Sequence, residues 1–325
     1  MKSLGNGLPD LARLTDGLTA VFSSNGSAHA PLSRIRRQPN IYVSTFPSEI
    51  VRCYFKDGTK LRVMCKHQTG SNYDGHGHWG GLEYEAMVYR DVLQSSHFSA
   101  PKFYGVYSDH ATDWTLLAIE YLNGAMRINK LPQPEAMGAA ARWIGLFHAE
   151  SERRLALECM PALKKYDAQY YVGWARRTSM FAGPLHGRFP WLTNVCDRFE
   201  DLIAPLLISA PTIIHGEYQP HNILGRDETS YPLDWQSAAI AAGEIDLVSL
   251  TDGDWPDDLV SHCEAEYKNA RWPDGAPANF EKALGAARLY WPLRWLGDLP
   301  EITINVSSLW RFDQLRGASE RLGLF

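Results

Sequence analysis

The stretch His215–Asn222, HGEYQPHN, places one acid, two histidines and the amide of Asn222 within eight consecutive residues. A second acid, Asp234, follows twelve residues after Asn222 in the segment PLDWQ. Magnesium that binds together with a nucleotide prefers hard oxygen ligands, and it usually takes only one or two of them from the protein. The side chains of Asn222 and Asp234 offer such oxygens. Glu217 precedes Asn222 by five residues. An acid there can orient an acceptor hydroxyl and take its proton, so the pattern predicts a metal–phosphate active site.

Length and composition predict a folded protein with two lobes. The 325 residues exceed the usual size of a single hydrophobic core. Hydrophobic residues make up 45% and charged residues 21% of the chain, which is typical of a globular protein. The net charge is −5, and the longest basic run is the short SRIRRQ at 33–38. These values argue against a nucleic-acid or polybasic membrane surface and favour a small-molecule partner, while the oligomeric state stays open.

The cysteine pattern and the apolar segments bear on location. Five scattered cysteines contain no C-x-x-C pair, so neither a zinc site nor a disulfide framework is expected. The first residues, MKSLGNGLPDLARL, lack the apolar core of a signal peptide, and no apolar stretch reaches 18 residues. We therefore expect a cytoplasmic protein.

We expect three parts along the chain: an arm at 1–40, a first lobe at 41–122 and a second lobe at 123–325. Within the arm, a helix is predicted near 9–22, followed by a linker of small residues. From residue 41 the pattern favours strands, which are IYVSTF, EIVRCYF and KLRVMCK. The turn KDGT between the last two indicates a hairpin, so the first lobe should begin as an antiparallel sheet.

A glycine-rich loop and then a helix are expected to follow this sheet. HQTGSNYDGHGHWGG at 67–81 contains too many glycines for regular structure and predicts a mobile loop. The segment at 82–94 has apolar residues at helical spacing, and Glu85 lies on the same face. A buried acid there needs a cationic partner. The strand at 114–120 then leads to a polar hinge, and the remaining sequence is mostly helical in pattern.

The motif spacing resembles that of the aminoglycoside phosphotransferase and choline kinase family, which has a protein-kinase-like fold. In that family the catalytic loop reads H-G-D-x-x-x-x-N, and a later strand ends in I-D-W-E. Here the segments read HGEYQPHN and LDWQ, so the acid is Glu217 and Gln236 follows the tryptophan. Further matches run in family order from about 41 to 250. The resemblance implies an α+β, two-lobed fold with a small antiparallel β lobe and a larger, mainly α lobe.

The resemblance also implies a role for each matched residue of the catalytic segment. Asn222 and Asp234 would bind Mg²⁺. Glu217 would occupy the position of the catalytic acid, and His215 would support the loop. GEIDLVSL resembles the segment whose carboxylate braces the catalytic loop, which here is Asp246.

Upstream matches imply the nucleotide site. LRVMCK resembles the phosphate-binding strand, so Lys66 would contact the phosphates of ATP or GTP. The helix beginning at YEAMVY would supply Glu85 as the partner of Lys66. A glycine-rich nucleotide motif is missing before Lys66, and STFPSE at 44–49 is the candidate for that turn. The hinge that receives adenine would be Glu120, Tyr121 and Leu122.

Three other features have competing interpretations. His76 and His78, two residues apart in GHGHWGG, suggest a metal site, but a solvated loop is favoured because no third ligand is near. TDGDWPDD at 251–258 could attract a cationic acceptor through acid and aromatic contacts, or it could be a solvated turn, which is slightly favoured. Tyr290, Trp291 and Trp295 are interpreted mainly as core residues, with one or two rings available to line a pocket.

The sequence therefore predicts an ATP- and Mg²⁺-dependent small-molecule kinase that phosphorylates a hydroxyl group. Aminoglycosides, other antibiotics, amino alcohols and sugars all remain open as acceptors, including cationic ones. The first alternative is a nucleotide-binding pseudokinase with a regulatory or scaffolding role, because the catalytic acid is Glu rather than Asp. An unrelated α+β binding protein is the second alternative, and the ordered matches argue against it.

Overall fold

The computed structural model describes residues 7–24, 30–40, 45–70, 73–131, 134–157, 160 and 162–324. Contacts within the chain divide it into two compact units. Unit 1 comprises 1–73, 79–125 and 231–236, and unit 2 comprises 74–78, 126–230 and 237–325. Two short segments, 74–78 and 231–236, therefore belong to a different unit from the residues that flank them in the sequence. Both carry residues of the candidate site.

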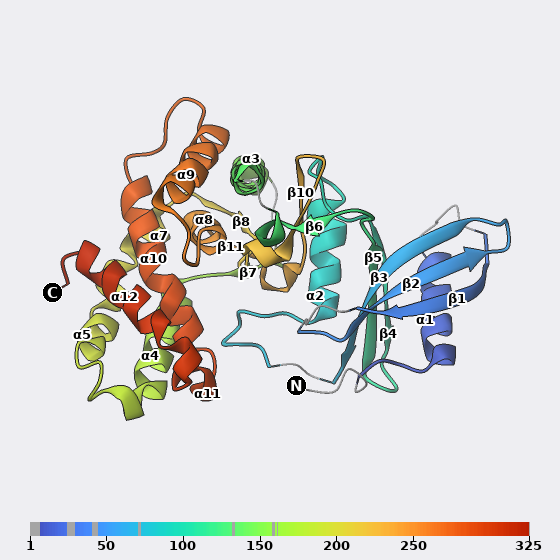
Figure 1. Ribbon diagram of the computed structural model, residues 1–325, viewed down its shortest axis with the longest axis horizontal. Coiled ribbons are helices and arrows are strands. Elements are labelled where there is room, and N and C mark those ends of the chain that lie inside the picture. The colour runs from blue at the N-terminus through green and yellow to red at the C-terminus, as the bar shows by residue number, and fades with distance from the viewer. Residues whose placement is uncertain are drawn as a thin grey trace. The chain divides into compact units, whose positions relative to one another are not determined.

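Unit 1 is built on one antiparallel sheet with the strand order β1-β2-β3-β5-β4 (Figure 1). The strands are β1 Leu32–Pro39, β2 Ser48–Phe55, β3 Lys60–Thr69, β4 Phe103–Asp109 and β5 Trp114–Glu120. The predicted hairpin joins β2 to β3, and Gly58 in its turn has a φ of 87°, which glycine adopts without strain.

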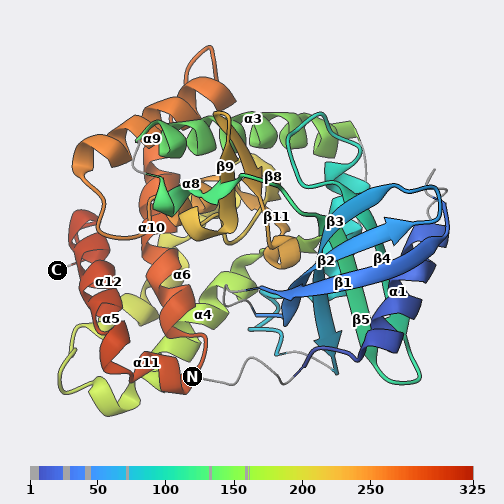
Figure 2. The ribbon, with the colours of Figure 1, turned by 45° about the vertical axis from the view of Figure 1, so that its right-hand side comes forward.

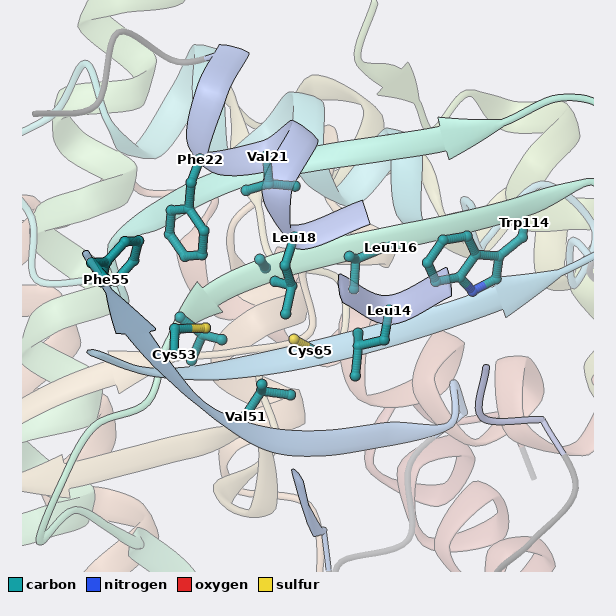
Figure 3. Close-up of a cluster of buried hydrophobic side chains, with 12 residues drawn as sticks. Leu14, Leu18, Val21, Phe22, Val51, Cys53, Phe55, Cys65, Trp114 and Leu116 are labelled. Carbon is teal, nitrogen blue, oxygen red and sulfur yellow. The ribbon is translucent and has the colours of Figure 1, made fainter. Parts of the chain in front are cut away.

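Helix α1, Leu11–Ser24, covers one face of this sheet. Its Leu14, Leu18, Val21 and Phe22 pack with a row of sheet residues, as Figure 3 shows. These sheet residues are Val51, Cys53, Phe55, Val63, Cys65, Trp114, Leu116 and Ala118.

The expected separate arm at 1–40 needs correction, because its described part supplies α1 and β1 to unit 1. β1 contains the basic run SRIRRQ, whose low apolar content hides the strand pattern. The expected strand IYVSTF falls largely outside the described residues, since 41–44 are not described.

Helix α2, Leu82–Met87, continues as a π-helical turn over Val88–Leu93. It lies against β3, β4 and β5 and buries Glu85. The segment 231–236, which carries Asp234, also belongs to unit 1.

Unit 2 is mainly helical, as the pattern predicts. Its helices are α3 Glu135–Leu157, α4 Ala168–Phe181, α5 Leu192–Asp197, α6 Phe199–Leu202, α7 Ala204–Ile208, α8 Glu244–Leu250, α9 Asp257–Arg271, α10 Phe280–Leu296, α11 Pro300–Thr303 and α12 Trp310–Arg321. α3 runs beside α9 (Figure 2), and α10 packs against α4, α8 and α12. Tyr290 and Trp291 on α10 are fully buried, which confirms their interpretation as core residues.

Short strands frame the HGEYQPHN loop. β8, Pro211–Ile214, pairs with β11, Ala239–Ala242, and β11 pairs with β7, Lys164–Lys165. The loop begins directly after β8 and leads into β9, Ile223–Arg226, which pairs with β6, Met126–Arg127. β10, Thr229–Pro232, then leads to the segment that holds Asp234.

The helical pattern at 191–207 is interrupted in the structure. The sequence at 191–207 has a helical pattern, but the structure contains α5, α6 and α7 in its place. Pro205 lacks an N–H and would clash with the carbonyl four residues earlier, so a continuous helix cannot pass from α6 into α7. Among the described residues, no helix is long and apolar enough to span a bilayer.

The docking of α1 can be tested with a pair of leucine substitutions. Leu18 is fully buried in the core of unit 1, whereas Leu11 on the same helix is 56% exposed. We expect Leu18→Ala to lower the free energy of unfolding by about 2–5 kcal/mol, because it removes buried methyl groups and leaves a cavity. Leu11→Ala should change it by less than about 0.5 kcal/mol. Urea unfolding followed by circular dichroism measures both, and equal effects would contradict the packing of α1.

Candidate active site

The HGEYQPHN loop is fixed by a single buried carboxylate. Asp246, in the first turn of α8, accepts hydrogen bonds from the backbone N–H groups of His215 (2.6 Å) and Gly216 (2.9 Å). His148 on α3 also contacts it, with 3.2 Å between Nε2 and Oδ2. Burial lowers the pKa of His148 to about 4, so its ring is neutral at pH 7 and donates to the carboxylate. Asp246 thus holds the start of the loop.

The loop also closes on itself. The Glu217 N–H donates to Nδ1 of His215 at 3.2 Å, and the Asn222 side-chain amide donates to the Glu217 carbonyl at 3.1 Å. Gly216 has a φ of 82°, and a Cβ there would collide with the Ser237 carbonyl oxygen. Glycine is therefore required at 216 on two grounds. These contacts fix the backbone from which the Glu217 side chain projects.

The Glu217 carboxylate forms a buried ion pair with Arg294 on α10. Glu217 is 8% exposed and Arg294 is fully buried. Burial alone would lower the pKa of Arg294, but Glu217 and Asp298 outweigh it and raise the pKa, so the guanidinium stays charged. The carboxylate that occupies the expected catalytic position is thus held by a permanent cation.

His78, from the glycine-rich loop, approaches Glu217 from another direction. Its Nε2 lies 3.6 Å from Oε1 of Glu217, and its Nδ1 contacts the hydroxyl groups of Tyr170 (2.9 Å) and Tyr166 (3.0 Å). Burial, followed by the charge of Arg294, lowers the pKa of His78 to about 3, so the ring is neutral at pH 7. The expectation of a solvated loop is wrong for this residue, because His78 is buried within unit 2.

Lys164 of β7 completes the surroundings of Glu217. Its ammonium donates to the His78 carbonyl at 2.6 Å. Burial lowers the pKa of Lys164 to about 7, although Glu217 and Asp74 act in the opposite direction. The groups near the acid are therefore mainly cationic or neutral nitrogen bases.

A second charged cluster lies in unit 1. Lys66 on β3 is 5% exposed, and its ammonium contacts both carboxylate oxygens of Glu85 at 2.7 and 3.0 Å. It also pairs with Asp234. Burial acts to lower the pKa of Lys66, but the charges of Asp234 and Glu85 outweigh it and raise the pKa. The structure thus brings together the predicted lysine, its helix partner and the acid of the LDW segment.

The two predicted metal ligands have suitable oxygen donors. Asp234 has a φ of 63°, a left-handed conformation that is uncommon outside glycine and is often found at functional sites. Because the amide nitrogen of Asn222 donates to Glu217, its amide oxygen is directed elsewhere. Asn222 belongs to unit 2 and Asp234 to unit 1. An amide oxygen and a carboxylate fit the hard-ligand preference of Mg²⁺.

The predicted hinge borders a cavity of unit 1. A cavity of about 380 Å³ is lined by Glu120 and Tyr121, together with residues of β2, β3 and β4. Leu122, the third hinge residue, is buried. A cavity of this volume is within the range of small-molecule sites.

The acidic turn has a structural role at one position. Asp252 receives hydrogen bonds from Arg311 at 2.6 and 2.7 Å and from Gln314 at 2.8 Å, all on side chains of α12. Asp257 and Asp258 lie in the first turn of α9, where carboxylates complement the helix dipole. Asp252 is therefore already neutralised within the protein.

The sequence analysis did not place Arg294, His78 or Lys164 beside Glu217. Arg294 carries a signal that could have been used, because it is a charge inside the apolar helical run LYWPLRWLG. His78 and Lys164 carry none, since their burial depends on which distant segments pack together.

Comparison with known proteins identifies the family. Residues 82–289, more than half of the chain, match the family described as "Phosphotransferase enzyme family". The chain belongs to this phosphotransferase family. The match covers the catalytic loop, the LDW segment and the Asp246 helix. No curated protein sequence matches the chain.

Solved structures share the fold of this phosphotransferase at low sequence identity. Choline kinase from Cryptosporidium parvum is 12% identical, with 97% of this chain and 98% of that chain covered and a TM-score of 0.63. A spectinomycin phosphotransferase, solved with ADP and spectinomycin, is 13% identical over 95% and 94%, with a TM-score of 0.56. A macrolide 2'-phosphotransferase from Brachybacterium faecium is 17% identical over 92% and 97%, with a TM-score of 0.53. The expected protein-kinase-like, α+β fold is confirmed.

The ion pair of the acid can be tested by a double-mutant cycle. Arg294→Met should destabilise the phosphotransferase by about 3 kcal/mol, because it leaves the Glu217 carboxylate buried without its counter-ion. Adding Glu217→Gln should restore part of that loss, since the uncompensated charge is then removed. Arg316→Met, which breaks the exposed Arg316–Glu320 pair on α12, should change stability by less than about 0.5 kcal/mol. Urea unfolding measures Arg294→Met, Glu217→Gln, the double mutant and Arg316→Met, and additive losses in the double mutant would rule out the coupling.

Proposed function

We propose that this phosphotransferase transfers the γ-phosphate of ATP, in the presence of Mg²⁺, to a hydroxyl group of a small molecule. The observation that carries the proposal is the carboxylate of Glu217, which projects from a loop braced by Asp246 and is held by Arg294. Glu217 would orient the acceptor hydroxyl and accept its proton as the oxygen attacks phosphorus. His215 supports this step by fixing the Glu217 backbone.

Lys66 would bind the nucleotide phosphates. A lysine ammonium is a compact charge suited to phosphate oxygens, and Glu85 holds it in position on the buried side. The hinge at Glu120, Tyr121 and Leu122 would receive the base beside the 380 Å³ cavity. This assignment accommodates ATP or GTP, and a solved relative contains ADP.

Asn222 and Asp234 would hold the metal. Bound Mg²⁺ neutralises the charge of the phosphate oxygens and helps to align them. Asp234 pairs with Lys66, so its carboxylate would exchange part of that contact for the metal. Both ligands should matter chiefly for nucleotide binding, and Glu217 should matter chiefly for turnover.

The acceptor belongs to a class of hydroxylated small molecules. Solved relatives are named for choline, spectinomycin and macrolides, which are chemically diverse. Because Asp252 pairs with Arg311, a cationic acceptor would depend on the other acids of the 251–258 turn. The predicted cytoplasmic location and the absence of a nucleic-acid or membrane partner stay predictions.

Turnover on a panel of acceptors tests the function. The protein is incubated with ATP, Mg²⁺ and aminoglycosides, macrolides, amino alcohols and sugars, and mass spectrometry detects phosphorylated products. Glu217→Gln should lower turnover by about 10²–10⁴-fold and keep stabilisation by Mg-ATP, because the acid acts on the acceptor. Asp234→Asn should weaken that stabilisation. Stabilisation without any product would favour the pseudokinase, and no stabilisation by Mg-ATP would refute both functions.

The length of the acid gives a further test. Glu217→Asp withdraws the carboxylate by roughly 1.5 Å, away from Arg294, and a misplacement of about 1 Å can reduce a rate about 10²-fold. We therefore expect turnover to fall by about that factor, with the KM for ATP little changed. Steady-state kinetics on the accepted substrate measures both constants. A strong rise in turnover would show that the pocket is not adapted to glutamate.

A further inference from the structure

Three arginines form a row across adjacent strands of unit 1. In the register of the sheet, Arg36 on β1 is directly opposite Arg52 on β2, and Arg52 is directly opposite Arg62 on β3. The row lies on the face opposite α1, because the alternate residues Val51 and Val63 point into the α1 core. Figure 3 shows Val51 on that covered face.

The row borders a cavity of about 440 Å³. The described residues that line it are Arg36, Arg37, Gln38, Ile50, Arg52 and Arg62. None of them is acidic, and no carboxylate among the described residues forms an ion pair with Arg36, Arg52 or Arg62. The volume is within the range of small-molecule sites.

Arg37, the neighbouring arginine of β1, is neutralised in a different way. Its guanidinium donates to both carboxylate oxygens of the buried Glu49, at 2.6 and 2.8 Å. Burial acts to raise the pKa of Glu49, but His67 and Arg37 outweigh it and lower the pKa. Strand β2 thus supplies the carboxylate of Glu49 to Arg37, whereas the three arginines of the row receive no carboxylate.

Like charges directly opposite each other on neighbouring strands destabilise a sheet. Arg52 has such a neighbour on both sides. Its effect extends to Tyr54 on the same strand face: partial burial acts to raise the pKa of this phenol, but Arg52 and Arg36 outweigh it and lower the pKa. An unbalanced positive row of this kind is stabilised when an anion binds it.

We propose that the row Arg36–Arg52–Arg62 is a binding site for a small ligand that carries at least two adjacent phosphate charges. Guanidinium groups bind phosphate oxygens in pairs of hydrogen bonds, and three of them match a ligand with several such oxygens. Arg62 is preorganised, because its side chain donates to Asn123 at 2.6 Å and stacks over Tyr121 at 4.1 Å.

The row is distinct from the phosphate position at Lys66. Arg62 and Lys66 project from the same face of β3, four residues apart, which corresponds to about 13 Å along a strand. A single diphosphate or triphosphate group bound at Lys66 cannot also cover Arg36 and Arg52. Arg52 and Arg62 also line the 380 Å³ cavity beside the hinge, so the row adjoins the proposed base position while lying apart from the phosphate position at Lys66.

Thermal unfolding at constant ionic strength tests the site with pyrophosphate and tripolyphosphate as probes. Both anions should raise the melting temperature of the full chain, and Arg36→Gln and Arg52→Gln should each reduce that shift by more than half. Lys66→Met should retain the shift while losing stabilisation by Mg-ATP. Lys56→Gln, which removes an exposed charge from the β2–β3 turn, serves as the charge-matched control and should retain it.

The ligand-free variants supply a second, opposite readout. Without anion, Arg52→Gln should raise the melting temperature by about 1–3 °C at low salt, because it relieves repulsion on both sides. The rise should shrink in 0.5 M NaCl, where exposed charges are screened. A pyrophosphate shift that survives in Arg52→Gln, or that disappears in Lys66→Met alone, would overturn the proposal. If the wild-type protein did not bind Mg-ATP but was still stabilised by pyrophosphate, the kinase function would be refuted and the arginine site would stand.

Discussion

The hydrogen bonds from the loop backbone to Asp246 are the contacts on which the position of Glu217, the proposed catalytic acid, depends. A buried carboxylate must be satisfied by donors, and the N–H groups of His215 and Gly216 supply them at 2.6 and 2.9 Å. The same bonds set the direction of the chain as it leaves β8, so they determine where Glu217 projects. The requirement for glycine at 216 follows from this close approach of two backbone segments.

The ion pair between Glu217 and Arg294 explains why a glutamate, rather than the shorter aspartate, fits at position 217. Glutamate reaches farther than aspartate, and here its carboxylate reaches a buried arginine on α10. The pair keeps the oxygen atoms in one place, which offsets the additional rotatable bond of the side chain. Glu217 is thus compatible with a working active site, which weakens the sequence argument for a pseudokinase without removing that alternative.

The sequence could predict what depends on local pattern and fixed spacing. The antiparallel hairpin, the Lys66–Glu85 pair and the loop from His215 to Asn222 all follow from residues that are close in sequence or ordered by the family motif. The burial of His78 could not be predicted, because glycines around it imply exposure and its partners, Tyr166 and Tyr170, are about ninety residues away. Strand β1 could not be predicted for a related reason. Its arginines obscure the alternation of inward-facing and outward-facing residues, which becomes visible only in the register of the sheet.

The cationic residues of this protein divide according to how their charge is balanced. Lys66 and Arg294 are buried and have carboxylate partners, as their location away from water requires. Arg36, Arg52 and Arg62 are in contact with solvent and can remain charged without carboxylate partners, yet their register places them beside one another. Solvent screening weakens the repulsion among the three arginines but does not make their arrangement favourable. A row that combined positive and negative side chains would be more stable. A ligand that brings the missing negative charge provides a physical reason for three guanidinium groups to share one row.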